Sequence, residues 1–503
     1  MTIAEALAPY PELAQEFANK ELFIKWATSQ LFGQKAEQRA HISLPAKDQL
    51  WLLQDILPAP EQPPAAGTSV AGYQRGARKN PVKPKPEDGQ IRFGPEVPVE
   101  VITVIDEEAK KIPEADRELV STRIVQKLAH RSSKVVIEYH YLTYKDKSSG
   151  ELFTPRAVDS VIPACLADVS FLASMLVDKF CWHLPLHRQH QRLVAEHIFV
   201  DRSSLTRWGQ GTIQHLEPIY HAVVSSVLSS KIAAADESPT PAGVGQGKMK
   251  KGYFWSFYGD KDEVFFLFSP SRGAEVIRNV MKGFEGVLLT DGYVAYESFV
   301  SGQPNVLHAQ CWAHARRKFI EAEAVAPEQC KLVLAMLQQL YALEQRAPLG
   351  SEELRGIRNQ HSRELVRRLF LYLEQQTAES CFLPSNKFVK AMQYVLDRRT
   401  ALQVFLDRPE VPLDTNHVER AIRAPVVGRK NWMFHTTETG ARNAAIVYTL
   451  IESCKLAKVD PLVYLTDVLQ RIQTHPATDV GELTPREWAK RFAEKPMRSI
   501  LDG

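Results

Sequence analysis

Short apolar runs alternate with amphipathic stretches between residues 231 and 326. The runs KIAAADES, GYFWSFYGD and EVFFLFSP predict three consecutive strands, because short apolar or aromatic runs bounded by turn formers are typical of strands. A helix is then expected from SRGAEVIRNVMKGF, followed by a strand ending in LLTD, a short helix, the strand NVLHAQC and the helix WAHARRKFIEAEAV. The order βββαβαβα predicts a mixed sheet with helices on its faces.

The pattern changes on both sides of this stretch. Residues 327–408 have apolar positions at helical spacing and no strand pattern, which predicts an inserted helical block. Further helices are expected from 409 to 475. Upstream, the β-branched runs VEVITVI and KVVIEYHYLTY flank a charged segment that we expect to be helical, so residues 99–160 predict a small α+β module.

Residues 161–230 predict two amphipathic helices separated by IFVDRSS. With Ser203 or Ser204 as N-cap, this arrangement resembles a helix-turn-helix. The second helix would then present Ser204, Thr206, Arg207 and Gln210 to DNA. A buried helical hairpin gives the same pattern, so both interpretations stay open.

Together these patterns predict a multidomain α+β chain. The expected divisions are an N-terminal helical region at 1–56, a basic Pro- and Gly-rich linker at 57–98, the small α+β module at 99–160, the helical DNA-binding region at 161–230, the first part of an α/β core at 231–326, the helical insertion at 327–408, the C-terminal helices of the core at 409–475 and a tail at 476–503.

Composition narrows the class of protein. The chain has 503 residues, 44% hydrophobic and 24% charged, with a net charge of +3, so any nucleic-acid contact must come from local clusters. Its six cysteines form no CxxC pair, which argues against a disulfide framework or zinc ribbon. No apolar run reaches the roughly 18–20 residues of a membrane span. The N-terminus lacks a signal-peptide pattern, so we expect a cytoplasmic protein.

Three acidic residues carry the main functional hypothesis. Asp236 and Asp291 each end an apolar run expected to be a strand, where ligand sites of α/β sheets form. Gly292 would permit close backbone approach beside Asp291, and Glu419 lies on a basic helical segment. Carboxylates on rigid elements are the ligands that two divalent cations about 3.5–4 Å apart require. The three acids therefore predict phosphoryl transfer on a nucleic acid. Glu237, next to Asp236, is expected to face the other way along the strand.

Cations gather around these acids. The segment of Glu419 carries four cations and a tryptophan, a combination suited to phosphates and an unstacked base. A second group, ARRKF, follows the strand NVLHAQC. The expected DNA contacts are Arg207, Arg316, Arg317, Lys318, Arg420, Arg423, Arg429, Lys430 and Trp432.

Cys311 and His314 stand one helical turn apart in CWAHARRKF. Such a pair can supply half of a zinc shell. His308 is the one obvious further ligand nearby, so a structural or hydrogen-bonding role is the alternative.

The strings ADESP, LLTDGYVAY, CWAHARRKF and LDTNHVERAIRAPVVGRKNWMF occur in this order and resemble the insertion-sequence 66 (IS 66) family of bacterial transposases. The resemblance is dense from about 161 to 473. It implies a DDE transposase with an RNase H-like core, whose motif acids fall on Asp236, Asp291 and Glu419. The family's cysteine-rich zinc-binding segment has no counterpart here, because residues 99–160 contain no cysteine.

This resemblance implies cleavage at the ends of an insertion sequence and transfer of the freed 3′-hydroxyl into target DNA. Two Mg²⁺ or Mn²⁺ ions per site are expected as cofactors. Expected partners are double-stranded DNA, further copies of the chain in a synaptic complex and accessory proteins of the same element, but no membrane. An RNase H-like nuclease and a non-catalytic DNA-binding protein derived from a transposase remain as alternatives. A two-carboxylate glycosidase is disfavoured by the cations around the acids.

Overall fold

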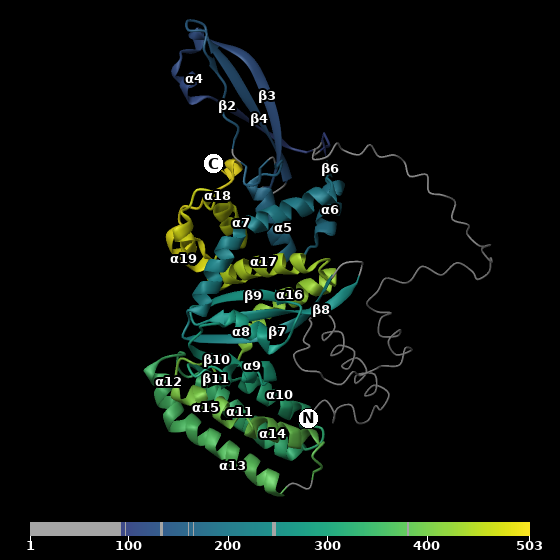
Figure 1. The fold of residues 1–503 in the computed structure, drawn as a ribbon, viewed down its shortest axis with the longest axis vertical. Coiled ribbons are helices and arrows are strands. Elements are labelled where there is room, and N and C mark those ends of the chain that lie inside the picture. The colour runs from purple at the N-terminus through teal and green to yellow at the C-terminus, as the bar shows by residue number, and fades with distance from the viewer. Residues whose placement is uncertain are drawn as a thin grey trace, which may run out of the picture. The chain divides into compact units, whose positions relative to one another are not determined.

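A computed structural model describes residues 92–95, 97–130, 134–158, 160–163, 165–243, 248–379 and 382–502 (Figure 1). The expected N-terminal helical region and nearly all of the linker lie outside the described residues.

A five-stranded mixed sheet organises the centre of the chain. Its strands are β7 (Ile232–Gly243), β8 (Met249–Gly259), β9 (Glu263–Ser269), β10 (Gly286–Thr290) and β11 (Val306–Gln310). Their order across the sheet is β11-β10-β7-β8-β9. The first three strands form an antiparallel meander, whereas β10 and β11 run parallel to β7. The prediction of three strands followed by alternating helices and strands is confirmed.

Helices cover both faces of this sheet (Figure 1). On one face, α7 (Arg202–Leu228) and α17 (Glu438–Leu456) pack against β9, and Thr449 of α17 accepts a hydrogen bond from the backbone N–H of Phe266 at 2.9 Å. The other face holds α8 (Ala274–Val280) and α9 (Val294–Val300). There the ring centres of Tyr296 and Trp255 lie 6.0 Å apart. Coverage on both faces explains why β8 and β9 are apolar runs without polar alternation.

Strand β7 is longer than expected. It continues past Glu237 through Pro239 and Pro241, and pairs with β8 as far as Met249. Pairing with β10 ends at Ala234, so the prolines lie where β7 is no longer flanked on both sides by strands. Proline, which has no N–H to donate, is tolerated at such edges.

The helical block predicted for residues 327–408 is confirmed: between β11 and the C-terminus the described residues form helices and loops, apart from an isolated β-bridge between His435 and Ala242. It follows α10 (Trp312–Ala322) and comprises α11 (Pro327–Glu344), α12 (Glu352–Ile357), a π-helical turn at Arg358–Ser362, α13 (Arg363–Glu379), α14 (Lys387–Leu396) and α15 (Arg399–Asp407). The chain then returns to the sheet through α16 (Asn416–Trp432). Fully buried Trp312 anchors the block, with its ring N–H donating to the Leu402 carbonyl at 2.8 Å.

The expectation for residues 99–160 is wrong in one respect. A four-stranded sheet is present, but most of the charged segment is strand β3 (Arg117–His130), and only α4 (Glu107–Lys111) and the 3-10 turn Glu114–Asp116 are helical. The other strands are β2 (Val99–Ile105), β4 (Lys134–Asp146) and β5 (Leu152–Phe153). Strand β3 forms one edge of the sheet and pairs with β4; it is largely exposed as far as Gln126, whereas Lys127 near its end is buried.

The helices at 161–230 also differ in detail from the expectation. They are α5 (Val169–Phe180), α6 (Leu186–Ala195) and α7, with β6 (Ile198–Phe199) paired to β1 (Arg92–Phe93) in the break. Asp201 is the N-cap of α7, so the prediction of Ser203 or Ser204 was wrong. Ser204 is buried, because the 27-residue α7 turns that side toward the core.

The last part of the chain forms α18 (Pro461–Arg471), the 3-10 helix Ala477–Leu483, α19 (Pro485–Arg491) and a final 3-10 turn, Ile500–Asp502. Buried Asp467 of α18 holds this end by accepting hydrogen bonds from the Trp488 ring at 2.9 Å and the Met497 backbone at 2.6 Å. None of the described helices is long and apolar enough to cross a membrane.

Candidate active site

Asp236 and Asp291 occupy matching positions on neighbouring strands. Strand β10 pairs with β7 in parallel, with Leu289 opposite Ala234. Continuing this register by two residues brings Asp291, just after the end of β10, level with Asp236. Neighbouring strands lie about 4.8 Å apart, so the shared register sets the two acids next to each other at one end of β10.

Local structure fixes both carboxylates. The Asp236 side chain accepts the N–H of Glu237 at 2.8 Å, and the Asp291 side chain accepts the N–H of Tyr293 at 2.9 Å. Between Asp291 and Tyr293, a Cβ added to Gly292 would meet the Arg398 side chain at 2.5 Å. The close approach expected at this glycine is therefore confirmed, and it is made by the helical insertion.

Asp236 faces helix α16. It lies opposite Ser256 on β8. Tyr258 and Phe254, two residues to either side of Ser256, contact α16 and the segment after it, with ring centroids 4.7 Å from His417 and 5.5 Å from His435. Residues two apart on a strand share a face, so Ser256 points to the same side as Tyr258 and Phe254. Asp236, directly opposite Ser256, shares that face, which is the side that carries Glu419.

Glu419, in the first turn of α16, is held by α10. Its two carboxylate oxygens lie 3.8 Å from His314 Nε2 and 3.6 Å from Arg317 Nη2. The helix start is fixed nearby, where Cys311 Sγ accepts hydrogen bonds from the N–H and hydroxyl of Thr415, each at 3.3 Å. Helix α10 therefore positions the third acid.

The electrostatics show that the three acids share one environment. Burial, together with the negative charges of Glu237, Asp291 and Glu419, raises the pKa of Asp236 to about 8. The carboxylates of Asp291 and Glu419 also act on His314, whose pKa is lowered by burial. Like charges gathered at a partly buried site are typical of a place that receives cations or a proton.

The donor chemistry fits a divalent cation, since carboxylate oxygens are hard ligands and Glu419 has a buried oxygen without a hydrogen-bond partner. Among the described residues, however, no three His, Cys, Asp or Glu side chains are gathered closely enough to hold a metal ion. Glu419 is instead turned toward His314 and Arg317.

Cys311 and His314 have separate surroundings. Cys311 is buried against Thr415, and burial raises its thiol pKa to about 11. His314 faces Glu419, with its Nδ1 buried and without a partner. His308, the expected third ligand, instead shares a 2.9 Å hydrogen bond with Thr290. These contacts favour structural and positioning roles for Cys311 and His314 over zinc binding.

The expected DNA contacts fall into two groups. Five cations are exposed: Arg207, Lys318, Arg420, Arg423 and Lys430. The other three cations are partly buried: Arg317 faces Glu419, Arg429 donates to the Pro239 carbonyl, and Arg316 also has a partner. The half-buried Trp432 ring packs edge-on against Phe180 at 6.2 Å.

Glu237, Arg272 and Tyr296 form a polar cluster that the sequence did not reveal. The Glu237 side chain is 1% exposed and accepts hydrogen bonds from Arg272 Nε at 2.8 Å and Tyr296 Oη at 2.6 Å. The prediction that Glu237 faces away from Asp236 is confirmed, because both partners lie on the α8–α9 side. Strand alternation gave the face of Glu237, but nothing in the loop sequence SPSRG indicated that Arg272 would reach it.

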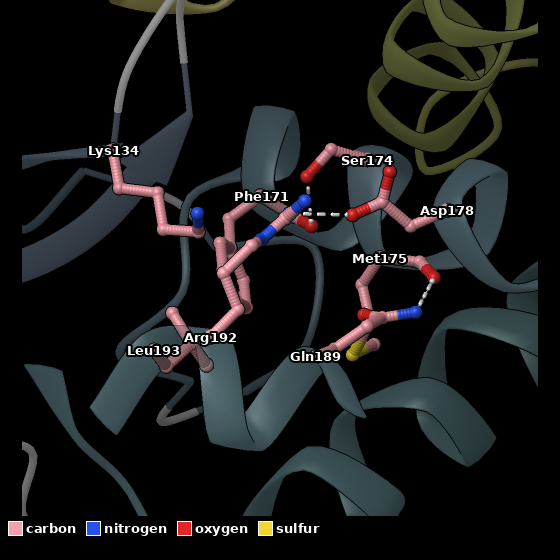
Figure 2. Close-up of a pocket in the computed structure, with 8 residues that line it drawn as sticks. All are labelled: Lys134, Phe171, Ser174, Met175, Asp178, Gln189, Arg192 and Leu193. Carbon is pink, nitrogen blue, oxygen red and sulfur yellow. Dashed lines mark hydrogen bonds and ion pairs between the residues drawn. The ribbon is translucent and has the colours of Figure 1, made fainter. Parts of the chain in front are cut away.

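A small cavity lies between α5 and α6 beside Lys134 (Figure 2). Its volume of about 10 Å³ has room for roughly one water molecule. Arg192 crosses it to reach Asp178 at 2.7 Å, and Gln189 donates to the Met175 carbonyl at 3.1 Å. None of the three candidate acids lines this cavity.

Comparison with known proteins places the chain among mobile-element proteins. The family described as Transposase IS66 family matches residues 164–443, more than half of the chain and all of the segment that carries the three acids. The chain belongs to the IS66 family of transposases. The IS66 C-terminal element matches residues 449–486, which include α18 and the end of α17.

Relatives in Sinorhizobium fredii support the same assignment. The uncharacterized proteins y4jD and y4qI are each 31% identical to this IS66 family chain, over 64% and 65% of its length. The chain spans just under two thirds of these two relatives, 66% and 63% of their lengths. A third uncharacterized protein, y4hP, is 27% identical over 94% of the chain and 89% of its own length.

Proposed function

We propose that this protein is a DDE transposase that cleaves DNA at the ends of an insertion sequence and joins the freed 3′-hydroxyl to target DNA. Asp236, Asp291 and Glu419 are the proposed catalytic acids. Family membership supports transposition as the role. The order β9-β8-β7-β10-β11, with a meander followed by two parallel strands, supports an RNase H-like core.

One observation carries the proposal. Two acids from neighbouring parallel strands stand in register, and the charge of a third, more than 100 residues later in the chain, acts on the first. A structural role for three such carboxylates would call for matching cations, because a buried carboxylate is costly unless paired. For Asp236 the principal charged neighbours are other carboxylates.

Asp236, Asp291 and Glu419 would hold Mg²⁺ or Mn²⁺. Bound at such a site, divalent ions lower the pKa of the attacking water or hydroxyl and stabilise charge on the leaving oxygen. The protein's own contribution is to orient the DNA. The exposed cations Lys318, Arg420 and Arg423, on α10 and α16, lie on the two helices that meet at Glu419 and are suited to backbone phosphates.

A transposition assay tests the proposal. Purified full-length protein is incubated with DNA that carries the element's ends, a target plasmid and Mg²⁺. Cleavage at the ends and joined element–target products are expected, and Asp236→Asn, Asp291→Asn and Glu419→Gln should each abolish both. Glu328→Gln, an exposed acid in the first turn of α11, is the matched control and should keep full activity.

The outcomes separate the alternatives. Cleavage without joined products would favour an RNase H-like nuclease. DNA binding with neither product, and no effect of the acid substitutions, would favour a non-catalytic DNA-binding protein and overturn the proposal. Assays with and without the accessory proteins of the element, and with one or two ends on the DNA, examine the proposed partners and the synaptic oligomer.

A further inference from the structure

Cations and aromatic rings alternate along the α8–α9 side of the sheet. The row consists of Lys251 and Tyr253 on β8, Arg272 in the loop before α8, and Tyr293 at the start of α9. Lys251 Nζ lies 5.5 Å from the Tyr253 ring centre, and Arg272 Cζ lies 5.9 Å from the same ring and 3.9 Å from the Tyr293 ring. We call these four residues the cation–aromatic row.

Buried groups hold the centre of the row in place. Arg272 donates to Glu237 through two of its nitrogens, and its own carbonyl accepts the Tyr293 hydroxyl at 2.9 Å. Glu237 is in turn fixed by Tyr296, which is fully buried. A surface arginine held by a buried carboxylate loses little further conformational entropy when it binds an anion, so the row is preorganised.

The row also offers free surface. The Arg272 side chain is 42% exposed, Lys251 is exposed and Tyr253 is half-buried. Arg272 covers the Tyr293 ring closely. The two cations near Tyr253 lie 5.5 Å and 5.9 Å from its ring centre, farther than Arg272 lies from the Tyr293 ring, so Tyr253 is covered less closely. Tyr253 is therefore the ring best placed to receive a flat ligand.

The position of the row relates it to the acids. Tyr253 pairs with Pro239, three residues along β7 from Asp236. At a rise of about 3.3 Å per residue, this corresponds to roughly 10 Å along the strand. Arg272 also contacts the residue next to Asp236, through Glu237. The row lies on the face of the sheet opposite Asp236, but the charge of Asp291 at the tip of β10 acts on Arg272. A DNA strand at the acids would therefore reach the row around the edge of β7 that β10 leaves unpaired beyond Ala234.

We propose that the cation–aromatic row binds an unpaired stretch of DNA strand beside the active site. A base stacks on Tyr253, and Lys251 and Arg272 contact the phosphates on either side of it. Aromatic rings beside cations suit single strands, whose base faces are open, whereas bases in a duplex cover one another. The proposal rests on the proposed function, because it names the form of DNA that this active site receives.

Binding measurements test the row without requiring catalysis. Full-length protein in EDTA is titrated into a labelled oligothymidylate of about 12 nucleotides, within the range that single-strand sites cover, and into a duplex of the same length. Tyr253→Ala should weaken single-strand binding about tenfold or more and change duplex binding little, while Tyr253→Phe should bind like the wild type. Lys251→Ala should reduce the salt dependence of single-strand binding: the slope of the logarithm of the binding constant against the logarithm of the salt concentration should become shallower by about 0.7.

Tyr144→Ala is the matched control, because Tyr144 is also half-buried with an arginine, Arg117, 4.8 Å from its ring, but lies on β4. It should leave single-strand binding unchanged. Thermal melting checks that each variant folds. If Tyr253→Ala does not fold, Lys251→Ala at the exposed end of the row carries the test.

The result separates the two proposals. Single-strand affinity that neither Tyr253→Ala nor Lys251→Ala changes would overturn the role of the row, even if the protein cleaves and joins DNA normally. Loss of single-strand binding in these variants, in a protein that neither cleaves nor joins DNA, would support the row and count against the proposed function.

Discussion

The buried carboxylates of the helical insertion and of the chain's end have surroundings opposite to those of the acids at the sheet. In the helical insertion, fully buried Arg358 pairs with Glu344, its Nη2 lying 2.6 Å from the carboxylate, and it also donates to three backbone carbonyls. At the end of the chain, Asp467 is bound by Arg471, a tryptophan ring and a backbone N–H. At the sheet, Asp236 has one backbone N–H and the charges of three other acids.

The difference separates stability from function. A carboxylate whose partners come from its own chain contributes to holding that chain together. A group of carboxylates that repel one another destabilises the folded protein and is retained where a ligand supplies the missing positive charge. Substitutions can change the paired carboxylates and the clustered acids separately.

Removing one acid of the sheet should have the largest effect. Asp236→Asn should lower the rates of cleavage and joining roughly 10³-fold, because the charge stabilisation supplied through such ligands is worth several kcal/mol. The same change removes a repelling charge, so the thermal midpoint should stay constant or rise. Assaying end cleavage and melting on the same preparation measures both. A lower midpoint together with the lost activity would mean that Asp236 has a structural role.

Removing the arginine that pairs with a buried carboxylate in the helical insertion should strongly reduce the stability of the protein. Arg358→Ala leaves Glu344 without its cation and three backbone carbonyls without their donor, and loss of one partner of a buried pair costs about 3–5 kcal/mol. Urea unfolding of the wild type and the variant gives the difference. Arg355→Ala, whose partner Glu352 is exposed on the neighbouring turn, is the control. A loss of less than about 1 kcal/mol of unfolding free energy in Arg358→Ala would mean that this buried pair does not stabilise the fold.

The pH dependence of stability tests the sheet acids more finely. The folded-state pKa of Asp236 is raised to about 8, well above the unfolded value, so the folded protein binds more protons between roughly pH 4 and pH 8. Its contribution to stability is present at low pH and is lost as the pH rises through this window, with a slope of at most about 1.4 kcal/mol per pH unit.

Unfolding measured from pH 5 to pH 8 in EDTA should therefore show a steeper loss of stability for the wild type than for Asp236→Asn. Mg²⁺ should reduce the slope, because a bound cation favours the ionised carboxylate. Equal slopes for the two proteins would show that burial and the neighbouring acids do not raise the pKa of Asp236 in the folded state.

The smallest effect is expected for an acid that is paired but exposed. Glu364 pairs with Arg367 and Arg368 on the surface of α13. Solvent screens such pairs, so Glu364→Gln should not measurably change the urea midpoint or the cleavage rate. A clear loss of stability would mean that pairing alone, without burial, explains the stability of the insertion.

Local pattern predicted the sheet because its strands are short apolar runs that end at turn formers. The same pattern singled out Asp236 and Asp291 as acids at the ends of strands. Asp291 does follow the end of β10, whereas Asp236 lies within β7, which continues to Gly243. Strand alternation also gave the direction of Glu237. These features depend on neighbours in the sequence, and each was visible without the fold.

Features that depend on distant partners were not predictable. Residues 117–130 carry charges typical of a surface helix, yet pairing with β4 makes them a strand. The run KIAAADES suggested that β7 ends near Asp236, but pairing with β8 carries the strand on to Gly243. Arg272 and His314 gained their roles only when a loop and a helix from other parts of the chain reached Glu237 and Glu419.

The helical insertion leaves and rejoins the core at nearly the same place. Cys311 binds Thr415, and the N–H of Trp312 donates to the Leu413 carbonyl at 3.1 Å, so some hundred residues form a loop closed at its base. Closing a longer loop costs little, about 0.6 kcal/mol for each doubling in length. The helical insertion can therefore be lengthened, shortened or exchanged in evolution while Glu419 keeps its place, provided that the hydrogen bonds between Cys311 and Thr415 are kept.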